Sequence, residues 1–267
     1  MRFRRLGWAG VELEAGGATL VIDHLIDPGI LVHFMTDERD ALIEPPSGSA
    51  SAALVTHLHR DHTDVEAIER VLAPDGVVLR PPRPHDFNEH DKITVGESEE
   101  AFAASSLDVR ELTAGDTLTV GPFTATAMFA SDGLGSPQVS WVIEAEGTRI
   151  YHAGDTLWHG AWWGAALAHG PFDLAFLPAN GVEISYPHLQ PAAKTAAVMN
   201  PEQAIDAAAA LQAAKLVPIH YNRTFEHPDY YRPISDAEER IGAAAWDRNI
   251  TVEFLEPGEW SESRIAA

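Results

Sequence analysis

The sequence predicts an α/β protein in which two β-sheets pack face to face between outer helices, a four-layer α/β/β/α sandwich. Strand-like runs fill the first and middle parts of the chain, and helix-like runs alternate with strands toward its C-terminal end. With 267 residues, 45% of them hydrophobic, the chain is long enough to fill one large core. We therefore expect a single domain over 1–267.

The first third of the chain begins with strands. In RFRRLGWAGVELEAGGATLVID the runs are alternating or apolar, and the pair Gly16-Gly17 between two of them is typical of a hairpin turn. The run SAALVTH at 51–57 predicts a short buried strand. Thr63 and Glu66 have the spacing of a capping box, and apolar residues follow at helical spacing. A helix is therefore expected just after this strand.

The remainder predicts strands first and then helices alternating with strands. Turn pairs such as Gly121-Pro122 separate consecutive strand-like runs. The expected strands are 76–80, 109–112, 117–120, 123–128, 139–145, 148–154, 173–179 and 215–221. The expected helices are 162–170, 191–199, 201–214, which begins at a proline, and 235–247, which begins with a Ser/Asp cap.

Composition narrows the classes of function. The net charge of −22 argues against nucleic acid as a partner, because such a surface repels phosphate backbones. No apolar run approaches the ~18 residues that span a bilayer, so no membrane partner is expected. The N-terminal MRFRRLGWAG lacks the apolar stretch of a secretory signal, and together with the absence of cysteine this predicts a cytoplasmic protein. Without cysteine, any metal ligands are His, Asp or Glu.

The motif THLHRDH at 56–62 is the strongest chemical signal. Side chains at i and i+2 of a strand point the same way, so His57 and His59 can hold one ion from one side. As the chain turns toward the helix, Asp61 and His62 can reach a second position nearby. Imidazole and carboxylate ligands suit Zn²⁺, Mn²⁺ or Fe²⁺, and two ions a few Å apart can share a water. The alternative is a polar strand end with solvated histidines.

Two later stretches contain partners for this motif. Asp155 follows Gly154 at a strand end in TRIYHAGDT, and His220 ends a buried strand in KLVPIHYN. Taken alone, a Gly-Asp pair is usually a turn, and a histidine at a strand end is usually a hydrogen-bonded core residue. Their order after THLHRDH favours a shared site.

The sequence resembles the metallo-β-lactamase superfamily, and within it the branch of ascorbate-6-phosphate-lactonase-like and uncharacterised metal-dependent hydrolases. The opening LGWAGVELEAGGATLVIDHL, THLHRDH, YHAGDT, DLAFLPANG and LVPIHYN occur in the family order over nearly the whole chain. The resemblance implies that Asp23 would lie beneath the site and orient a ligand histidine. It implies these ligands: His57 and His59 for a first ion, Asp61, His62 and His220 for a second, and Asp155 for both.

The family pattern breaks at two points. A third histidine for the first ion is usual in the segment that here reads TATAMFASDGLG, where Ala130 cannot coordinate a metal. Either the first ion is bound weakly or not at all, or another group replaces the ligand, and Asp132 and His188 are candidates. The alternatives are a solvated turn residue for Asp132 and a surface or substrate-pocket residue for His188. His24 replaces a usual proline and is expected either near the site or as a buried structural histidine.

These features predict a metal-dependent hydrolase that contains one or two divalent ions, Zn or Mn first and Fe as an alternative. Asp61 and Asp155 would act in catalysis by positioning a metal-activated water and its proton. The substrate would be a small-molecule lactone, ester or phosphoester, in a pocket shaped by 81–108 and 180–190. The alternative is a degenerate mononuclear or metal-poor member that acts as a binding protein or an iron-dependent redox enzyme. The oligomeric state is left open.

Overall fold

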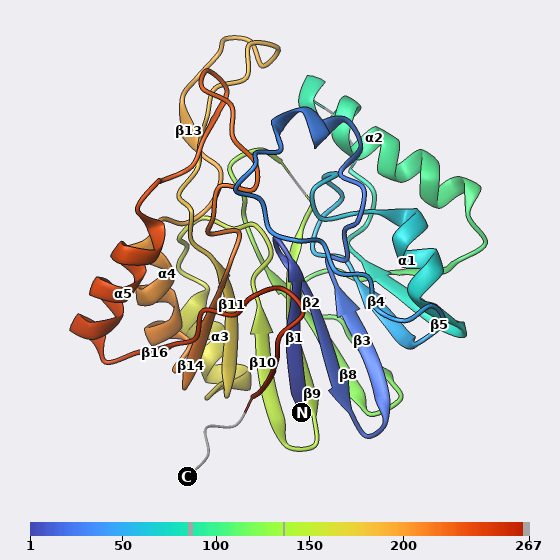
Figure 1. Ribbon diagram of the computed structural model, residues 1–267. Helices are drawn as coiled ribbons and strands as arrows, with labels where there is room; N and C mark the ends of the chain where they lie inside the picture. The colour runs from blue at the N-terminus through green and yellow to red at the C-terminus, as the bar shows by residue number, and fades with distance from the viewer. Residues whose placement is uncertain (85–87, 136, 264–267) are drawn as a thin grey trace.

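A computed structural model describes residues 1–84, 88–135 and 137–263. Within these ranges two seven-stranded sheets pack face to face with helices on both outer sides (Figure 1), which confirms the α/β/β/α sandwich. The first sheet has the order β17 (Trp260–Glu262), β1 (Arg2–Gly7), β2 (Gly10–Ala15), β3 (Ala18–Ile22), β4 (Ala50–Leu54), β5 (Leu72–Arg80) and β6 (Asp108–Glu111). The second has the order β16 (Thr251–Val252), β14 (Lys215–Ile219), β11 (Leu174–Pro178), β10 (Thr148–His152), β9 (Val139–Ala145), β8 (Phe123–Phe129) and β7 (Thr117–Val120).

The main core lies between the two sheets, and strand periodicity explains how it is filled. Successive strand residues face opposite sides, so Trp141 and Ile143 of β9 enter the space between the sheets while Val142 faces the helices. Phe3 of β1 meets Phe176 of β11 edge to face across this space, with ring centroids 5.4 Å apart.

Helices cover the outer face of each sheet. On the first sheet lie α1 (Val65–Val71) and α2 (Glu89–Ala104), which contribute buried residues such as Ile68 and Phe102. On the second lie α3 (Trp162–His169), α4 (Pro201–Ala210) and α5 (Ala237–Arg248). None of the helices in the described part of the chain has the length and apolar character needed to cross a bilayer.

Most expected elements are confirmed, with corrections at helix ends. The Gly16-Gly17 turn joins β2 to β3 as predicted. The predicted capping box at Thr63 is wrong: Asp64 caps α1 by accepting a hydrogen bond from Ala67 N, whereas the Thr63 hydroxyl donates to the carbonyl of His57. Helix α4 begins at its proline but ends before residue 214, at Ala210.

The predicted helix at 191–199 is also wrong. The segment is extended and forms β13 (Thr195–Ala196), which pairs with β12 (Glu183–Ile184), itself paired with β15 (Tyr231–Arg232). Backbone hydrogen bonds from Ala197 N to Val182 O and from Met199 N to Thr156 O replace the helical ones. This small sheet and the 3₁₀ helix η1 (Gly29–Phe34) lie above one end of the sandwich in Figure 1, and α2 reaches toward the same end.

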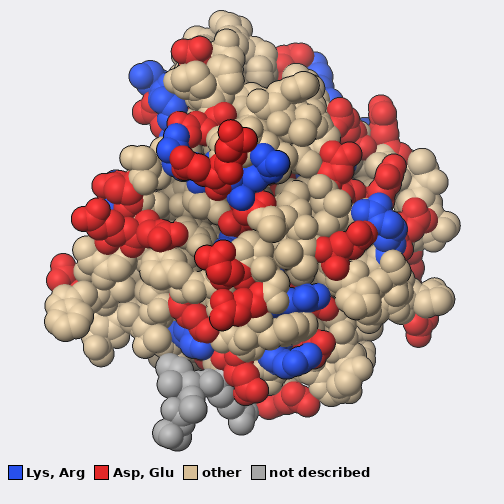
Figure 2. All heavy atoms as spheres, in the orientation of Figure 1, with Lys and Arg blue, Asp and Glu red and all other residues tan. Residues whose placement is uncertain are grey.

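The surface agrees with the composition. Figure 2 shows Asp and Glu over much of one face, with Lys and Arg in smaller groups between them. Many of these cations are paired, as in the bidentate contact of Arg240 with Glu202. The remaining excess of carboxylates gives the net charge of −22.

Candidate metal centre

The predicted ligand residues meet at one edge of the sandwich because several strands end there. β3 leads to Asp23, β4 to the THLHRDH loop, β10 to Asp155 and β14 to His220. β4 is parallel to β3, and β10, β11 and β14 are parallel to one another, so their carboxyl ends gather the following residues at one end. The loop itself is tight, with the backbone N–H groups of His62 and Thr63 both donating to His59 O.

The ligand-type atoms form two adjoining groups. Asp61, His62, Asp155 and His220 form one, and His57, His59 and Asp61 form the other, with the ligand atoms of each group within 4.8 Å of one another. Asp61 belongs to both. Asp155 belongs to the first group, and its contact with both ions stays a prediction.

Asp155 lies between two histidines. Its Oδ1 is 3.1 Å from His62 Nε2, and its Oδ2 is 3.2 Å from His220 Nε2. Burial alone would raise the pKa of the Asp155 carboxyl, but the imidazoles of His220 and His62 outweigh burial and hold the pKa well below its usual range. Burial would likewise lower the pKa of His62, but Asp155, Asp61 and Asp23 together raise it well above its usual value. Asp155 is therefore an ionised carboxylate, as a metal ligand must be.

Asp23 organises the loop from below. It accepts hydrogen bonds from Thr56 N at 2.8 Å, from the Thr56 hydroxyl at 2.7 Å and from His62 Nδ1 at 2.8 Å. Because the Thr56 hydroxyl donates to Asp23, it accepts from His57 Nδ1 at 3.1 Å. Nε2 of both histidines is thereby left as the nitrogen that faces the site. This is the arrangement expected of a carboxylate that orients ligand histidines.

Asp61 is held by a residue that the sequence analysis did not identify. Trp8 Nε1 donates to Asp61 Oδ2 at 3.3 Å, and the Trp8 ring lies on His220 with centroids 3.9 Å apart. The same Asp61 oxygen is 3.8 Å from His62 Nε2 and 3.9 Å from His220 Nε2. Trp8 follows β1 and meets these residues only through the fold, so no local pattern in the sequence indicates its role.

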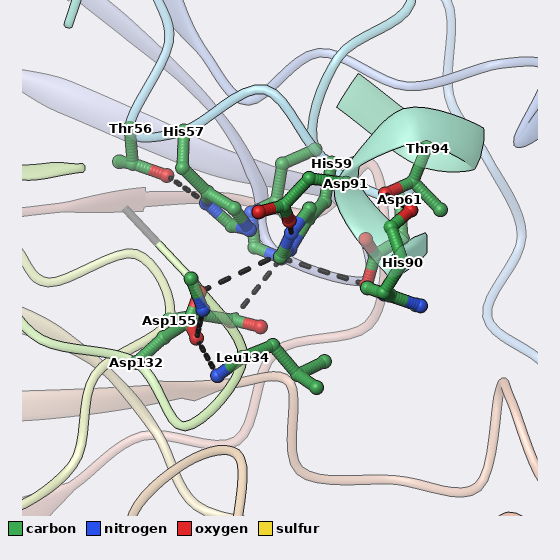
Figure 3. A network of polar contacts seen from close by, with 12 residues as sticks. Thr56, His57, His59, Asp61, His90, Asp91, Thr94, Asp132, Leu134 and Asp155 are labelled. Atoms are coloured by element: carbon green, nitrogen blue, oxygen red, sulfur yellow. Dashed lines mark hydrogen bonds and ion pairs between the residues drawn. The ribbon is translucent and has the colours of Figure 1, made fainter. Parts of the chain in front are cut away.

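Two carboxylates lie around His59, on the side of the site where the family has a third histidine and this chain has Ala130 (Figure 3). Ala130 is buried just after β8 and offers only a methyl group. Asp132 accepts backbone hydrogen bonds from Leu134 and Gly135 with Oδ1, while its Oδ2 lies 3.9 Å from His59 Nδ1. On the opposite side of the ring, His59 Nε2 lies 3.3 Å from Asp91 Oδ1. His59 thus lies between two aspartates.

These groups differ in ionisation. Burial and the neighbouring imidazoles of His62 and His59 lower the pKa of His57, which keeps a neutral ring with a lone pair. Burial raises the pKa of Asp132 to about 6, partly offset by His59, so this carboxyl is mostly ionised at neutral pH. Burial would lower the pKa of His59, but its hydrogen bond to Asp91 and the charge of Asp132 raise it.

Asp132, His188 and His24 do not belong to either ligand group. His188 Nε2 lies 3.3 Å from His90 Nδ1, and the two rings stack with Tyr186 beside the site. His24 is fully buried, and neither of its ring nitrogens has a hydrogen-bond partner among the described residues. Its burial lowers its pKa to about 4, so it is a neutral buried histidine, the second of the two expectations.

Two features mark the centre as a built site. Trp8, Asp23 and His220 each adopt a left-handed backbone, with φ of 47°, 46° and 46°, a conformation that non-glycine residues rarely take and that clusters at functional sites. In addition, His57 Nε2 is buried without a hydrogen-bond partner in the described part of the chain. A buried imidazole nitrogen without a partner is costly, and a divalent cation would satisfy it. The residues present therefore fit a metal.

Comparisons with known proteins agree with this chemistry. A UPF0173 metal-dependent hydrolase of Thermococcus kodakarensis is 28% identical over 247 residues, which cover 88% of this chain and 89% of the relative. Another from Thermus thermophilus is 28% identical and covers 96% of both chains. Among solved structures, CmlA of Streptomyces venezuelae, a diiron β-hydroxylase, has a TM-score of 0.72 at 19% identity over 99% of this chain and 54% of its own, which shows a shared fold alone.

The two relatives, together with the fold, support a metal-dependent hydrolase. The narrower resemblance to ascorbate-6-phosphate lactonases stays a prediction. The model of the beta-lactamase superfamily domain matches residues 23–221, a span that contains every proposed ligand. The chain therefore belongs to the metallo-β-lactamase superfamily.

Proposed function

We propose that this protein hydrolyses a small-molecule lactone, ester or phosphoester with the help of one or two divalent metal ions. The observation that carries the proposal is the pair of adjoining ligand groups that share Asp61. Asp61, Asp155 and Tyr231 line a cavity of about 30 Å³ beside these groups, where the reacting bond of a substrate would lie. The net charge of −22 supports a small molecule rather than a nucleic acid as the substrate.

The proposed ligands divide between two positions. Asp61, His62, Asp155 and His220 would hold one ion, and His57 and His59 a second, with Asp132 in place of the histidine that Ala130 lacks. Asp132 Oδ1 is occupied by two backbone donors and Oδ2 faces His59, so the free oxygen points toward the second position. Asp91 would then play for His59 the part that Asp23 plays for His62.

A divalent ion bound here supplies an acidified water and a Lewis acid for the substrate oxygen. The protein groups supply orientation and proton transfer. Asp61 or Asp155 takes a proton from the attacking water and passes it to the leaving oxygen, while the water oxygen bonds to the acyl carbon and the bond to the leaving oxygen breaks. Burial and the charges of Asp61 and Asp155 raise the pKa of Tyr231 well above its usual value. Its hydroxyl therefore stays protonated and can donate to the substrate carbonyl.

Metal analysis by mass spectrometry of purified wild type and Asp61→Ala tests the proposal. Asp37→Ala, which removes an exposed carboxylate, is the matched control. About two ions per chain in wild type and in the control, with a loss in Asp61→Ala and turnover of an ester, lactone or phosphoester panel, supports a dinuclear hydrolase. About one ion that Asp61→Ala abolishes supports a mononuclear one.

Ala130 keeps one alternative open, a metal-poor member that binds ligands or carries out iron-dependent redox chemistry. No ion above background after reconstitution with Zn²⁺, Mn²⁺ or Fe²⁺ would rule out the hydrolase. A carboxylate in place of an imidazole at the second position favours Mn²⁺ over Zn²⁺ there, because harder oxygen ligands suit Mn²⁺. Comparing the three ions in the same reconstitution measures this preference directly.

A further inference from the structure

An apolar pocket opens beside the metal centre. It has a volume of about 220 Å³, and its lining includes Ile30, Leu31 and Phe34 of η1, Ile93 of α2 and Tyr230. These residues come from segments far apart in the sequence that meet above the end of the sandwich, where Figure 1 shows η1, α2 and the loops around β12 and β15. Ile30 and Ile93 are 43% and 38% exposed, so they form an apolar rim.

The pocket adjoins the cavity at the metal centre. Leu31, Phe34, His90, Thr94 and Tyr186 line both. A molecule whose reacting bond lies near Asp61 and Asp155 would therefore have the pocket next to its substituent. Ligand sites of this kind, apolar with a few convergent polar groups, are typical of small-molecule binding.

The charged side chains that line the two cavities indicate which substituents they can accept. Among the described residues that line them there is no Lys or Arg, and the acidic side chains are Asp61 and Asp155, both in the group of metal ligands. Recognition of a phosphate or carboxylate on the substrate ordinarily uses Arg, Lys or a cluster of backbone N–H groups. A substrate with an anionic substituent in this pocket would lose its hydration and gain no cation.

We infer that the substrate is a neutral ester or lactone whose apolar substituent, an aryl ring or an alkyl chain of similar size, occupies the pocket lined by Ile30, Phe34, Ile93 and Tyr230. The inference rests on the proposed hydrolysis and narrows its substrate class, away from substrates with an anionic substituent. The size is consistent, because a cavity of ~150 Å³ lined by apolar side chains accommodates benzene.

The first test measures binding without turnover. Ligand-observed NMR on metal-loaded protein compares 4-phenylbutan-2-one, a neutral ketone that cannot be hydrolysed, with 4-(3-oxobutyl)benzoate, which has the same ketone and a carboxylate on the ring. We expect the ketone to bind and the carboxylate to bind at least tenfold more weakly. Ile30→Asn should weaken ketone binding severalfold. Val32→Asn, at a similarly exposed position of η1 that lines neither cavity, should not. Equal binding of the two probes, or equal effects of the two variants, overturns the inference.

The second test uses turnover and separates the two proposals. For 4-nitrophenyl esters we expect kcat/KM to rise roughly fourfold per added methylene from acetyl to hexanoyl, because each buried methylene contributes about that factor. The hemisuccinate should react at least tenfold more slowly than the pentanoate of similar size. Hydrolysis that is independent of chain length and charge overturns the apolar pocket and leaves the hydrolase intact. Selective ketone binding with no hydrolysis of any ester, lactone or phosphoester overturns the hydrolase and leaves the apolar pocket as a binding site.

Discussion

The carboxylate of Asp23 accepts a hydrogen bond from Nδ1 of His62 over 2.8 Å, and both side chains are buried. The bond holds the ring of His62 in place and directs Nε2 toward Asp155. In Asp23→Asn only one side-chain oxygen is left to accept from the three donors, and the amide N–H₂ is a donor that faces another donor. We expect metal affinity to fall tenfold to 100-fold, the usual effect of losing such a partner. Competition with a fluorescent chelator measures the change.

The control for this variant is Asp75→Asn, at an exposed position in β5, which should keep the affinity of wild type. If Asp23→Asn bound metal as tightly as Asp75→Asn, then Asp23 would support the fold of the loop without tuning its histidines.

Asp132 is expected to hold the position nearest His59. Asp132→Asn keeps an oxygen for the backbone donors Leu134 and Gly135 but replaces the charged oxygen that faces His59. We expect the metal content to fall by about one ion per chain while the ion at Asp155 remains. In the double variant Ala130→His with Asp132→Asn, the family's imidazole should restore the lost ion. Metal analysis after dialysis would contradict this role if Asp132→Asn kept the full content.

The sequence was sufficient for those features that depend on local spacing. The two sheets follow from period-2 runs separated by turn residues. The spacing of THLHRDH was enough to identify its candidate ligands, although the strand expected at 51–57 ends at Leu54 and His57 and His59 lie in the loop after it. Asp155 and His220 could be added from their order after THLHRDH and from the family resemblance. In the structure both follow strands that are parallel to β11, whose carboxyl ends share one edge.

Helix α2 could not be predicted in this way. Its buried face contains His90, Asp91, Thr94 and Ser98 beside only two large apolar residues, so it has no apolar stripe to mark a helix. Yet this helix brings Asp91 to His59 and Ile93 to the apolar pocket. The alanines between 192 and 197 led to a predicted helix that the structure does not have, because pairing with β12 overrides their helix propensity.

Gly154 is required where β10 turns toward Asp155. Its φ is +60°, and a Cβ there would lie 2.5 Å from Cβ of Thr56, the residue that links Asp23 to His57. Gly121 has a similar φ of +55° with no atom within 4 Å of such a Cβ. We therefore expect Gly121→Ala to cost about 1 kcal/mol of unfolding free energy, from backbone strain alone. Gly154→Ala should cost about 3 kcal/mol or more and weaken metal binding. Urea unfolding of the two variants measures the difference, and equal losses would exclude the clash.

His24 is expected to make stability depend on pH. Its pKa falls from 6.5 to about 4 on folding because it is buried, so the unfolded chain binds its proton more tightly. Stability from this group is fully present above pH 6.5 and is lost as the pH falls toward 4, by roughly 3 kcal/mol in total. In His24→Leu this term is absent, so the metal-free variant should lose less stability than metal-free wild type between pH 7 and pH 4.5. Parallel losses in urea unfolding at the two pH values would show that His24 does not titrate in this way.

Trp8 is expected to position Asp61 through a single hydrogen bond. Trp8→Phe removes the Nε1 donor, which lies 3.3 Å from Asp61 Oδ2, but keeps an aromatic ring against His220 and Phe225. Without this hydrogen bond the Asp61 carboxylate can rotate. Since Asp61 belongs to both ligand groups, the affinity for both ions should fall together, by about fivefold to tenfold for the loss of ~1 kcal/mol. Trp163→Phe, at an exposed position on α3, is the matched control and should leave affinity unchanged. Selective loss of one ion in Trp8→Phe would mean that the hydrogen bond orients Asp61 toward that position alone, and unchanged affinity for both would mean that the ligand groups fix Asp61 without Trp8.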